Sequence, residues 1–191
     1  MQFSKDKNFK LQMIVANDIE GGIGYKNSLP WGRHDGDMKW MKSHVKDTTL
    51  LMGHNTLKSL PKKKIPDTKY IVITKSRITK DTKNLNVDLY IHIPFILPKP
   101  AIKYYVIEQL NRYAEAHNET LITLFGGKQV YDLLIEEVDV LLLTTFQDTF
   151  ECDTYIDREL LVSYLPHCGE RIEEEDVVYE MYYKEPLTIL V

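Results

Sequence analysis

The chemistry that this sequence could support centres on one carboxylate, Asp37. It follows an apolar loop that begins after a Gly turn and ends in Pro30-Trp31, and it precedes a Met- and Trp-rich run that extends to Met41. Burial among such side chains disfavours the charged form of a carboxyl group and therefore raises its pKa. A raised pKa suits a group that must hold or relay a proton near neutral pH. The pattern predicts a single proton donor beside a flat, partly apolar ligand, between a loop and a helix.

Asp37 also has a purely structural interpretation. Residues 37–46 carry apolar side chains at helical spacing, and they predict a helix that begins at Asp37. An acid in the first turn of a helix is a common stabilising placement, because it faces the positive end of the helix dipole. The residue by itself does not decide between the two roles.

Two glycine clusters could bring the backbone close to a ligand. Gly126-Gly127 follows a predicted strand at residues 121–125 and precedes a predicted helix at residues 129–137. Glycine lets the main chain approach a ligand, and a helix N-terminus offers free N–H groups to phosphate. A plain structural turn is the alternative. The second cluster, Gly21-Gly22-Ile23-Gly24, has no helix after it, so it does not fit a Rossmann fingerprint.

Strands and helices alternate along most of the chain. The expected strands cover residues 11–16, 48–52, 70–74, 87–93, 121–125, 138–146, 177–183 and 187–191, and the longer expected helices cover residues 37–46, 103–117 and 129–137. A short helix capped by Asn55 or Thr56 should end at Leu60, and the prolines at positions 94, 98 and 100 predict a loop. This pattern predicts one α/β domain, residues 1–191, with a mostly parallel central sheet, flanking helices and an antiparallel C-terminal edge.

Composition narrows the function classes. The chain has 191 residues, 43% of them apolar and 27% charged, with a formal net charge of -4. These values are typical of a soluble globular protein and argue against a general nucleic-acid binder. Cys152 and Cys168 lack metal or redox spacing, so we expect no metal site and a reducing, cytoplasmic location. Neither a signal peptide nor a membrane partner is expected.

Taken in order, these motifs resemble the dihydrofolate reductase family from about Leu11 to Tyr155. The matching segments are residues 14–16, 23–31, 52–56, 70–74, 125–131 and 153–154, with Asp37 and Thr144. Each motif is common by itself, but the shared order is specific. The resemblance implies a three-layer dihydrofolate reductase-like fold and reduction of 7,8-dihydrofolate to tetrahydrofolate with NADPH. The spacing at Trp31-Gly32-Arg33 is similar to that of phage members of the family.

The resemblance implies a substrate site around Asp37. Asp37 would hydrogen-bond the pterin ring and promote protonation of the ring nitrogen beside the carbon that receives hydride. Thr144 would hydrogen-bond both Asp37 and the ring's amino group, and Trp31 would hold an ordered water. The other substrate-binding residues would be Ile14, Ala16, Leu29, Met38, Met41, Leu60 and Phe125.

The resemblance also implies an NADPH site. The nicotinamide would lie near Ala16 and Gly24, and the pyrophosphate would lie along the segment that follows Gly126. A hydroxyl beside a cation, at Thr74 and Lys75, suits the adenosine 2′-phosphate. The implied cofactor-binding residues are Ala16, Ile23, Gly24, His54, Asn55, Thr56, Thr74, Lys75, Gly126, Gly127, Lys128, Gln129, Val130 and Tyr131.

One departure from the family pattern concerns the glutamate tail of folate. Asp67 and Thr68 stand where the family usually has Gly-Arg, whose Arg binds the tail's α-carboxylate. Lys69 or Lys62 could substitute as a point charge, although Arg and Lys are not interchangeable at a bidentate site. If neither does, the tail is bound weakly.

Two further departures concern the cofactor and a loop. His54-Asn55 stands where the family tends to carry a basic residue after Gly53, which could weaken phosphate binding. Cys152 stands where a Gly commonly precedes Asp-Thr, which could alter loop motion.

Two other functions remain open on the sequence. A reductase of another heterocycle, such as the pyrimidine reductase of riboflavin synthesis, shares this fold and needs no anchor for a glutamate tail. A catalytically idle nucleotide-binding or structural protein is the third hypothesis. Asp37, Thr144 and the glycine pair favour the folate enzyme. We expect a monomer, with a dimer as the alternative, and antifolate inhibitors as further ligands.

Overall fold

The structure is a computed structural model that describes residues 6–61, 63–76 and 86–186. The chain forms two compact units. The first unit contains residues 1–10 and 45–134, and the second contains residues 11–44 and 135–191. Each unit has its own set of strands and helices, and the two are described in turn.

The described part of the first unit is built on parallel strands in the order β5-β4-β3-β6. They are β3 (Thr49–Gly53), β4 (Lys69–Thr74), β5 (Leu89–His92) and β6 (Leu121–Gly126). Leu50, Leu51 and Met52 on β3 are fully buried. A continuous apolar run of this kind is expected of a parallel strand that is covered on both faces.

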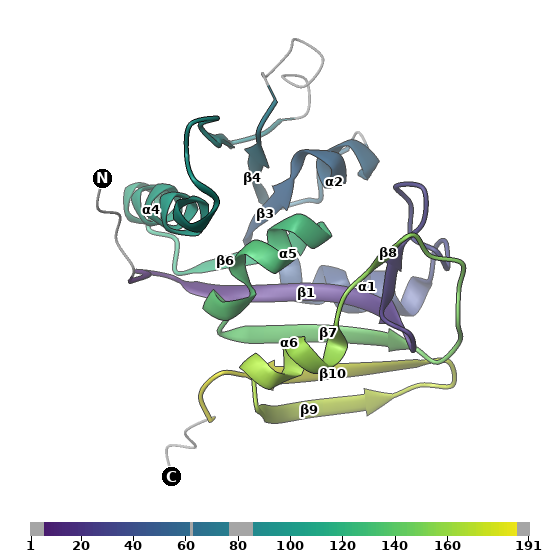
Figure 1. The fold of residues 1–191 in the computed structure, drawn as a ribbon. Coiled ribbons are helices and arrows are strands. Elements are labelled where there is room, and N and C mark those ends of the chain that lie inside the picture. Colours follow the sequence, from purple (N-terminus) through teal and green to yellow (C-terminus); the bar gives the residue numbers. More distant parts are fainter. Residues whose placement is uncertain (1–5, 62, 77–85, 187–191) are drawn as a thin grey trace. The chain divides into compact units, whose positions relative to one another are not determined.

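In the described part of the first unit, these strands are accompanied by the helices α2 (His54–Ser59), α4 (Lys99–His117) and α5 (Lys128–Leu134). Helix α2 packs on β3 and β4, and α5 packs on β6 and β3 (Figure 1). Helix α4 buries Val106, Ile107, Leu110, Tyr113 and Ala114, a stripe at helical spacing.

Helix α4 begins four residues earlier than predicted. Pro98 is its N-cap and Pro100 lies in its first turn, so prolines that predicted a loop are part of the helix start. The first turn tolerates proline because the N–H groups there have no intrahelical acceptor.

The predicted side-chain cap of α2 is wrong. The helix begins at His54, Gly53 occupies the cap position in an extended conformation, and no side chain bonds the first turn. Strand β3 runs directly into the helix, so Asn55 and Thr56 both lie inside it. The C-terminal end matches the prediction, since Leu60 is already extended before Pro61.

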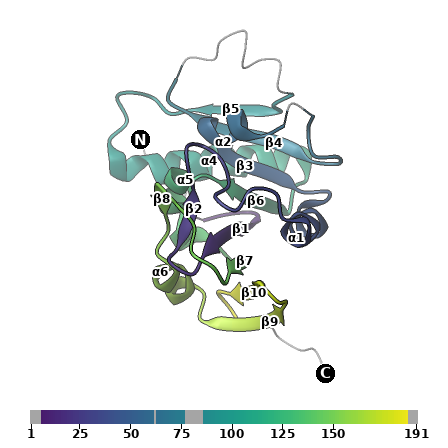
Figure 2. The same ribbon diagram turned by 90° about the vertical axis from the view of Figure 1, so that its right-hand side faces the viewer.

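The second unit has the strand order β1-β7-β10-β9 (Figure 2). The strands are β1 (Lys10–Asp18), β7 (Val140–Phe146), β10 (Val177–Tyr183) and β9 (His167–Glu173). β1 and β7 are parallel, with Ala16 opposite Thr144, whereas β10 runs antiparallel to both β7 and β9. A small separate sheet pairs β2 (Gly22–Gly24) with β8 (Thr154–Tyr155).

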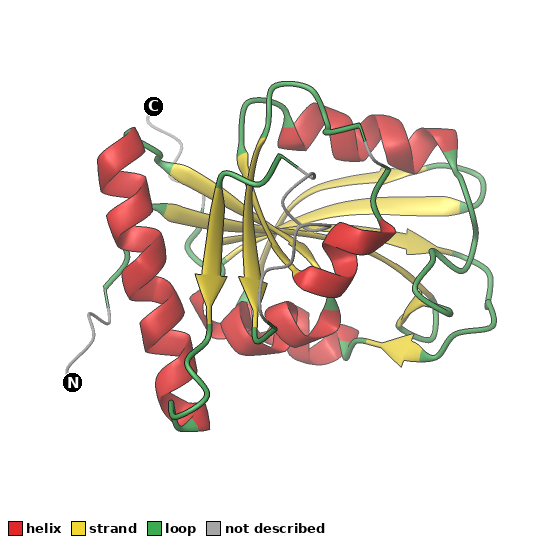
Figure 3. Ribbon diagram, turned by 90° about the horizontal axis from the view of Figure 1, so that it is seen from above, coloured by secondary structure: helices red, strands yellow, loops and turns green. Residues whose placement is uncertain are grey.

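Figure 3 draws the helices of the described residues in red. In the described part of the second unit they are α1 (Asp35–Val45), the short η1 (Ile135–Glu137) and α6 (Arg158–Tyr164). Helix α6, which was not predicted, is capped by Asp157, whose carboxylate accepts from Leu160 N at 2.9 Å. None of the helices in the described part of the chain is long and apolar enough to cross a membrane.

Strand β9, which pairs with β10, was missed. Every residue of β9 is exposed, so it shows no alternation of apolar and polar side chains. Residues 187–191 lie outside the described residues. The predicted class, α/β with mostly parallel strands and an antiparallel C-terminal pair, is confirmed. The prediction of a single domain stays a prediction.

Candidate active site

Asp37 lies in the first turn of α1 in the second unit, and it is only 6% exposed. Burial raises the pKa of its carboxyl group. A hydrogen bond from Thr144 and the charge of a protonated His34 lower that pKa to a smaller extent. Thr144 itself is 1% exposed on β7. The structure thus places a carboxyl group that readily keeps a proton beside a hydroxyl that favours its ionised form.

An aromatic cluster lies next to this strand. Trp31 stacks on Phe146 with a centroid distance of 4.3 Å, and it meets Phe150 edge-on at 5.9 Å. Ala16 packs against the same cluster. The indole Nε1 of Trp31 is buried and has no hydrogen-bond partner among the described residues. A buried N–H without a partner is costly, so this atom is suited to a water or ligand acceptor.

The sequence analysis did not single out Asp18. Asp18 is fully buried. One carboxylate oxygen accepts from the backbone N–H groups of Glu20 at 3.0 Å and Gly22 at 2.7 Å, and the other accepts from Phe150 N at 3.0 Å. Asp18 therefore ties the turn that precedes the Trp31 loop to the segment that carries Phe150.

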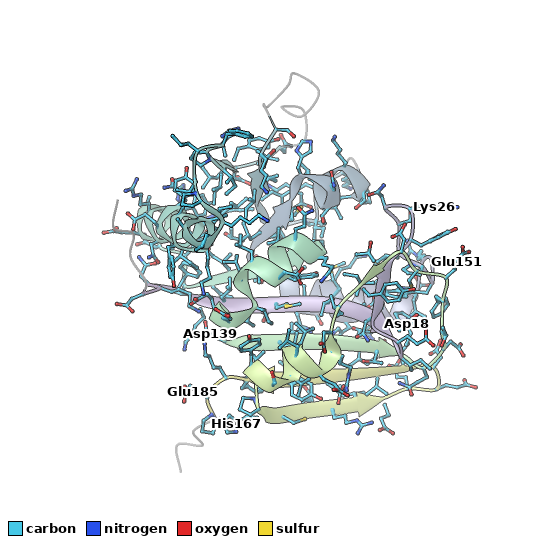
Figure 4. All side chains as sticks on the ribbon, viewed as in Figure 1. Asp18, Lys26, Asp139, Glu151, His167 and Glu185 are labelled. Carbon is cyan, nitrogen blue, oxygen red and sulfur yellow. The ribbon has the colours of Figure 1, made fainter. Side chains whose placement is uncertain are left out.

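A second set of contacts joins the tips of the same two segments. The Asp153 carboxylate accepts from Lys26 N at 2.8 Å, and the Tyr25 hydroxyl donates to Glu151 at 2.7 Å. Asp18, Lys26 and Glu151 gather at one end of the second unit (Figure 4). These residues hold a loop on which Leu29 is 44% exposed.

Cys152 lies beside Asp18, where the two segments meet. Its Sγ is 3.8 Å from Asp18 Oδ2, and a Cβ placed on Gly22 would lie 2.3 Å from the same Sγ. Burial raises the pKa of the Cys152 thiol, and the Asp18 charge adds to that shift. The thiol that replaces the family's common glycine thus fills space that only a glycine at position 22 leaves open.

The remaining predicted substrate residues lie in both units. Ile14 is buried on β1, and Met38 and Met41 are half-buried on α1 in the second unit. Leu60 and Phe125 belong to the first unit and are half-buried.

The predicted nucleotide-binding residues of the first unit meet at the glycine pair. The Gly126-Gly127 peptide bond is cis, and Gly126 has a φ of 123°. A Cβ on Gly126 would lie 3.3 Å from both Thr56 Cγ2 and the Tyr131 hydroxyl, and one on Gly127 would lie 3.0 Å from Thr56 Oγ1. These short distances show that β6 and the starts of α2 and α5 come together at the turn, which the sequence predicted only through the family resemblance.

The other predicted cofactor residues differ in their exposure and in their hydrogen-bond partners. Asn55, Lys128 and Gln129 are exposed, and Lys128 is paired with Asp132 at 2.9 Å. His54 Nδ1 is buried without a partner among the described residues, and burial lowers the pKa of its imidazole. Val130 is buried, and Ile23 and Gly24 lie on β2 in the second unit.

Thr74 is the last residue of β4, and its side chain bonds the backbone of the next turn. It is 3% exposed, and its hydroxyl accepts from Ser76 N at 3.0 Å. Lys75 and Ser76 are exposed. Ser76 was not predicted, although a second hydroxyl beside the Thr-Lys pair was visible in the sequence.

Residues 67–69 occupy the place where the family usually binds the glutamate tail of folate with an Arg. Asp67 has a φ of 57°, a left-handed conformation that glycine adopts most readily. Thr68 is 8% exposed and donates to Ile65 O at 2.7 Å. Lys69 donates to the Glu119 carboxylate, so it is already paired. Lys62 lies outside the described residues.

Among the described residues, no group of three or more His, Cys, Asp or Glu side chains could hold a metal ion. The site residues instead form a buried acid with an aromatic wall and, in the other unit, a glycine turn between two helices. These features define an α/β protein of the reductase class. The chain belongs to the dihydrofolate reductase family: the family model described as dihydrofolate reductase matches residues 10–160.

Individual relatives and a solved structure agree with this assignment. Dihydrofolate reductase type 9 of Escherichia coli is 32% identical over 154 residues, which cover 81% of this chain and 80% of that protein. Dihydrofolate reductase of Enterococcus faecium is 28% identical over 171 residues, 90% of this chain and 89% of that protein. A structure of Enterococcus faecalis dihydrofolate reductase complexed with NADP(H) and RAB-propyl has a TM-score of 0.71 and 26% identity, and covers 93% of this chain and 97% of that chain.

Proposed function

We propose that this chain reduces 7,8-dihydrofolate to 5,6,7,8-tetrahydrofolate with NADPH, and that Asp37 assists protonation of the pterin ring. The observation that carries the proposal is the buried Asp37 carboxyl group bonded by Thr144. A carboxyl group whose pKa is raised can bond a ring nitrogen and an amino group while it exchanges a proton near neutral pH. Family membership supports the same reaction.

Asp37 and Thr144 have complementary roles in this proposal. Asp37 promotes protonation of the ring nitrogen next to the carbon that is reduced. The Thr144 hydroxyl donates to Asp37, which favours the ionised carboxylate, and its oxygen can accept from the ring's amino group. Trp31 supplies an N–H for an ordered water near the ring, which fits its unpartnered indole Nε1.

Apolar residues shape the pterin slot. Ile14, Ala16, Met38 and Met41 line it, and Leu29 covers it from the loop. The family resemblance also assigns Leu60 and Phe125 to substrate binding. Exclusion of water by such side chains strengthens the electrostatic effect of the single carboxylate.

The residues present fit a dinucleotide. NADPH supplies the hydride when it is bound. The Gly126-Gly127 turn leaves open a space that a Cβ would fill, between Thr56 and Tyr131. Thr56 and its neighbours His54 and Asn55 bind phosphate at the start of α2, and residues 128–131 continue along the pyrophosphate. Ile23 and Gly24 bind near the nicotinamide.

The preference for NADPH over NADH is assigned to the end of β4. Lys75 is exposed and offers a cation to the 2′-phosphate. Thr74 orders that turn through its hydroxyl bond to Ser76 N. Ser76 extends the predicted pair, because its hydroxyl lies one residue after Lys75 on the exposed turn.

An enzyme of this kind functions in the cytoplasm as a monomer, and antifolate inhibitors compete for its pterin slot. The large exposed apolar side chains among the described residues belong to several segments of the chain.

A second candidate, an NADPH-dependent reductase of a heterocycle without a glutamate tail, is favoured by one observation. The position of the usual tail-binding Arg is a buried Thr68, and the neighbouring Lys69 is paired with Glu119. The aminopyrimidine substrate of riboflavin synthesis is the test compound for this alternative.

The test follows the decay of NADPH absorbance by purified protein with dihydrofolate, beside Asp37→Asn and an NADH control. We expect turnover that needs Asp37, prefers NADPH and is inhibited by an antifolate. Turnover only with the aminopyrimidine would replace the folate proposal with the second candidate. NADPH binding without turnover of either compound would contradict both.

A further inference from the structure

The first turn of α1 meets β10 at a glycine. A Cβ built on Gly36 would lie 2.7 Å from the hydroxyl oxygen of Tyr179, 3.0 Å from His34 Cε1 and 3.2 Å from Glu174 Oε2. The first distance is well inside van der Waals contact. A side chain at position 36 therefore cannot share this space with the Tyr179 hydroxyl. Position 36 immediately precedes Asp37, the proposed proton donor.

Tyr179 is held firmly where it meets this turn. It is 2% exposed and belongs to a buried apolar cluster. Its ring lies 5.0 Å from the ring of Trp40, which is one helical turn after Gly36 on α1. On the sheet, its backbone is paired with Thr144 of β7. Because the side chain is packed on both sides, the turn of α1 is the part that moves when position 36 is enlarged.

The same turn contains the hydrogen bonds that begin the helix. Asp37 N donates to His34 Nδ1 at 3.1 Å, and Met38 N donates to His34 O at 3.0 Å. A Cβ at position 36 would also press on His34 Cε1, so it would disturb these bonds as well as the contact with Tyr179. The position of the Asp37 backbone therefore depends on the small size of Gly36.

The contact between Gly36 and Tyr179 depends on size rather than on charge. Burial, with a smaller contribution from nearby acids, raises the pKa of Tyr179 to about 12, so its hydroxyl is neutral near pH 7. The hydroxyl donates to Glu174 Oε2 at 3.5 Å, and Glu174 is exposed. Loss of the hydroxyl therefore leaves no buried charge without a partner. Tyr179→Phe removes the crowding oxygen atom and keeps the ring.

We propose that Gly36 and Tyr179 form a size-matched pair that fixes the first turn of α1 on β10, and that Tyr179 is thereby a positioning residue for Asp37. The effect on turnover rests on the proposed function, whereas the size match is a property of the fold. A displacement of about 1 Å can lower turnover about 100-fold, so the position of this turn affects the chemistry.

The first experiment compares the wild type with Gly36→Ala, Tyr179→Phe and the double variant. Gly36→Ala should lower kcat by at least about tenfold, because the new Cβ pushes the turn away from β10. Tyr179→Phe alone should be nearly as active as the wild type. The double variant should be at least about tenfold more active than Gly36→Ala, because the crowding oxygen is gone. A double variant no more active than Gly36→Ala would overturn the pair.

The binding of NADPH separates positioning from general damage to the fold. Its dissociation constant, measured by isothermal titration calorimetry, should be the same in the wild type and in all three variants. The loss in Gly36→Ala should therefore be a loss of kcat alone. An equal loss of NADPH affinity in Gly36→Ala would overturn the positioning role.

Thermal midpoints test the size match independently of turnover. Alanine is a better helix former than glycine. Gly36→Ala should therefore raise the midpoint in the Tyr179→Phe background, where space is available, and lower it in the wild-type background. A change of the same sign in both backgrounds would overturn the size match.

Gly169 on β9 provides the matched control. A Cβ there would lie 2.4 Å from Tyr183 Cε2, and the three atoms nearest to that Cβ all belong to Tyr183. Gly169→Ala thus crowds another tyrosine of β10 in the same unit. It should lower the thermal midpoint and leave kcat unchanged. A fall in kcat as large as that of Gly36→Ala would show general loosening of the sheet and would overturn the positioning role.

The fluorescence of Trp40 reports the position of α1 without turnover, because its ring contacts Tyr179. In a Trp31→Phe background, Gly36→Ala should shift the emission, and the double variant should return it to that of Tyr179→Phe alone. If this pattern is found and the wild type reduces no dihydrofolate, the size match stands and the proposed reaction fails. If turnover needs Asp37 while neither kcat nor emission responds to Gly36→Ala, the reaction stands and this inference fails.

Discussion

Thr144 on β7 donates a hydrogen bond to the Asp37 carboxyl group on α1, and this bond lowers a pKa that burial raises. Replacement of Thr144 by Val removes the donor at nearly constant volume. The pKa of Asp37 should then rise, and the falling limb of kcat against pH should move to higher pH. Thr144→Ser keeps the hydroxyl and should restore the wild-type limb. The measurement is a pH–rate series for the three proteins, and identical limbs in Val and Ser variants would contradict this prediction.

Asp37 should reduce the stability of the fold near neutral pH. Because its pKa is raised in the folded protein, the unfolded chain releases this proton first, above the ordinary aspartate value of 3.8. The folded state then binds more protons, so stability falls as pH rises through the window between that value and the folded pKa, at about 1.4 kcal/mol for each pKa unit of difference. Above the folded pKa the loss is complete.

Asp37→Asn should therefore raise the thermal midpoint relative to the wild type, while it sharply reduces turnover. The difference should be small at about pH 4 and should grow towards about pH 7. Differential scanning calorimetry across this range checks the prediction. A midpoint difference that does not depend on pH would show that Asp37 is not the source of the slope.

The hydrogen bonds of Asp18 should control how the ring of Phe150 packs against Trp31. Asp18→Asn loses part of the acceptor set for three backbone N–H groups, so we expect a loss of about 1–3 kcal/mol in the free energy of unfolding. Because Phe150 N is one of these groups and the Phe150 ring contacts Trp31, the fluorescence of Trp31 in a Trp40→Phe background should also change.

Asp139→Asn is the matched control for Asp18. Asp139 also accepts a backbone N–H in the second unit, from Leu11 at 2.7 Å, but the aromatic contacts of Trp31 are with Phe146 and Phe150. The control should cost stability without a change in Trp31 emission. Equal emission changes in the two variants would mean that general loosening, rather than the Asp18 contacts, moves Trp31.

Thr68→Arg should strengthen binding of the glutamate tail. The new guanidinium can bind a carboxylate bidentately, so the KM for dihydrofolate should fall while the KM for NADPH stays the same. Glu119→Gln, which releases Lys69, should act in the same direction but more weakly, because Lys offers only a point charge. If neither change alters the KM for dihydrofolate, the tail does not bind near Thr68.

Much of the fold follows from local patterns. The buried strands at β3, β4, β6 and β7 are continuous apolar runs, and each was predicted within a few residues. Strand β9 carries His, Cys and charged residues that are all exposed, so only its pairing with β10 makes it a strand. Hydrogen bonding to a partner strand leaves no local signature when neither face is buried.

The candidate site was predictable in part for the same reason. Asp37, Trp31 and the glycine pair stand in recognisable local sequence, so their types and order are enough to single them out. His34 was not singled out, because its contact with Asp176 distinguishes it from the neighbouring polar residues and Asp176 is distant in the sequence. Lys69 is a plausible anchor by residue type, but its pairing with Glu119 depends on a contact across 50 residues of chain.

Residue types and their spacing were enough to identify the family, to single out one acid in an apolar setting and to predict the alternation of strands and helices, because this information is carried along the chain. Which groups meet depends on the folding of the chain in space: Thr144 and His34 lie at Asp37, Asp18 binds Phe150 N, and Thr56 lies at the glycine pair. Desolvation, charge coupling and hydrogen bonds act over a few ångströms in space, so they depend on contacts between segments that are far apart in sequence.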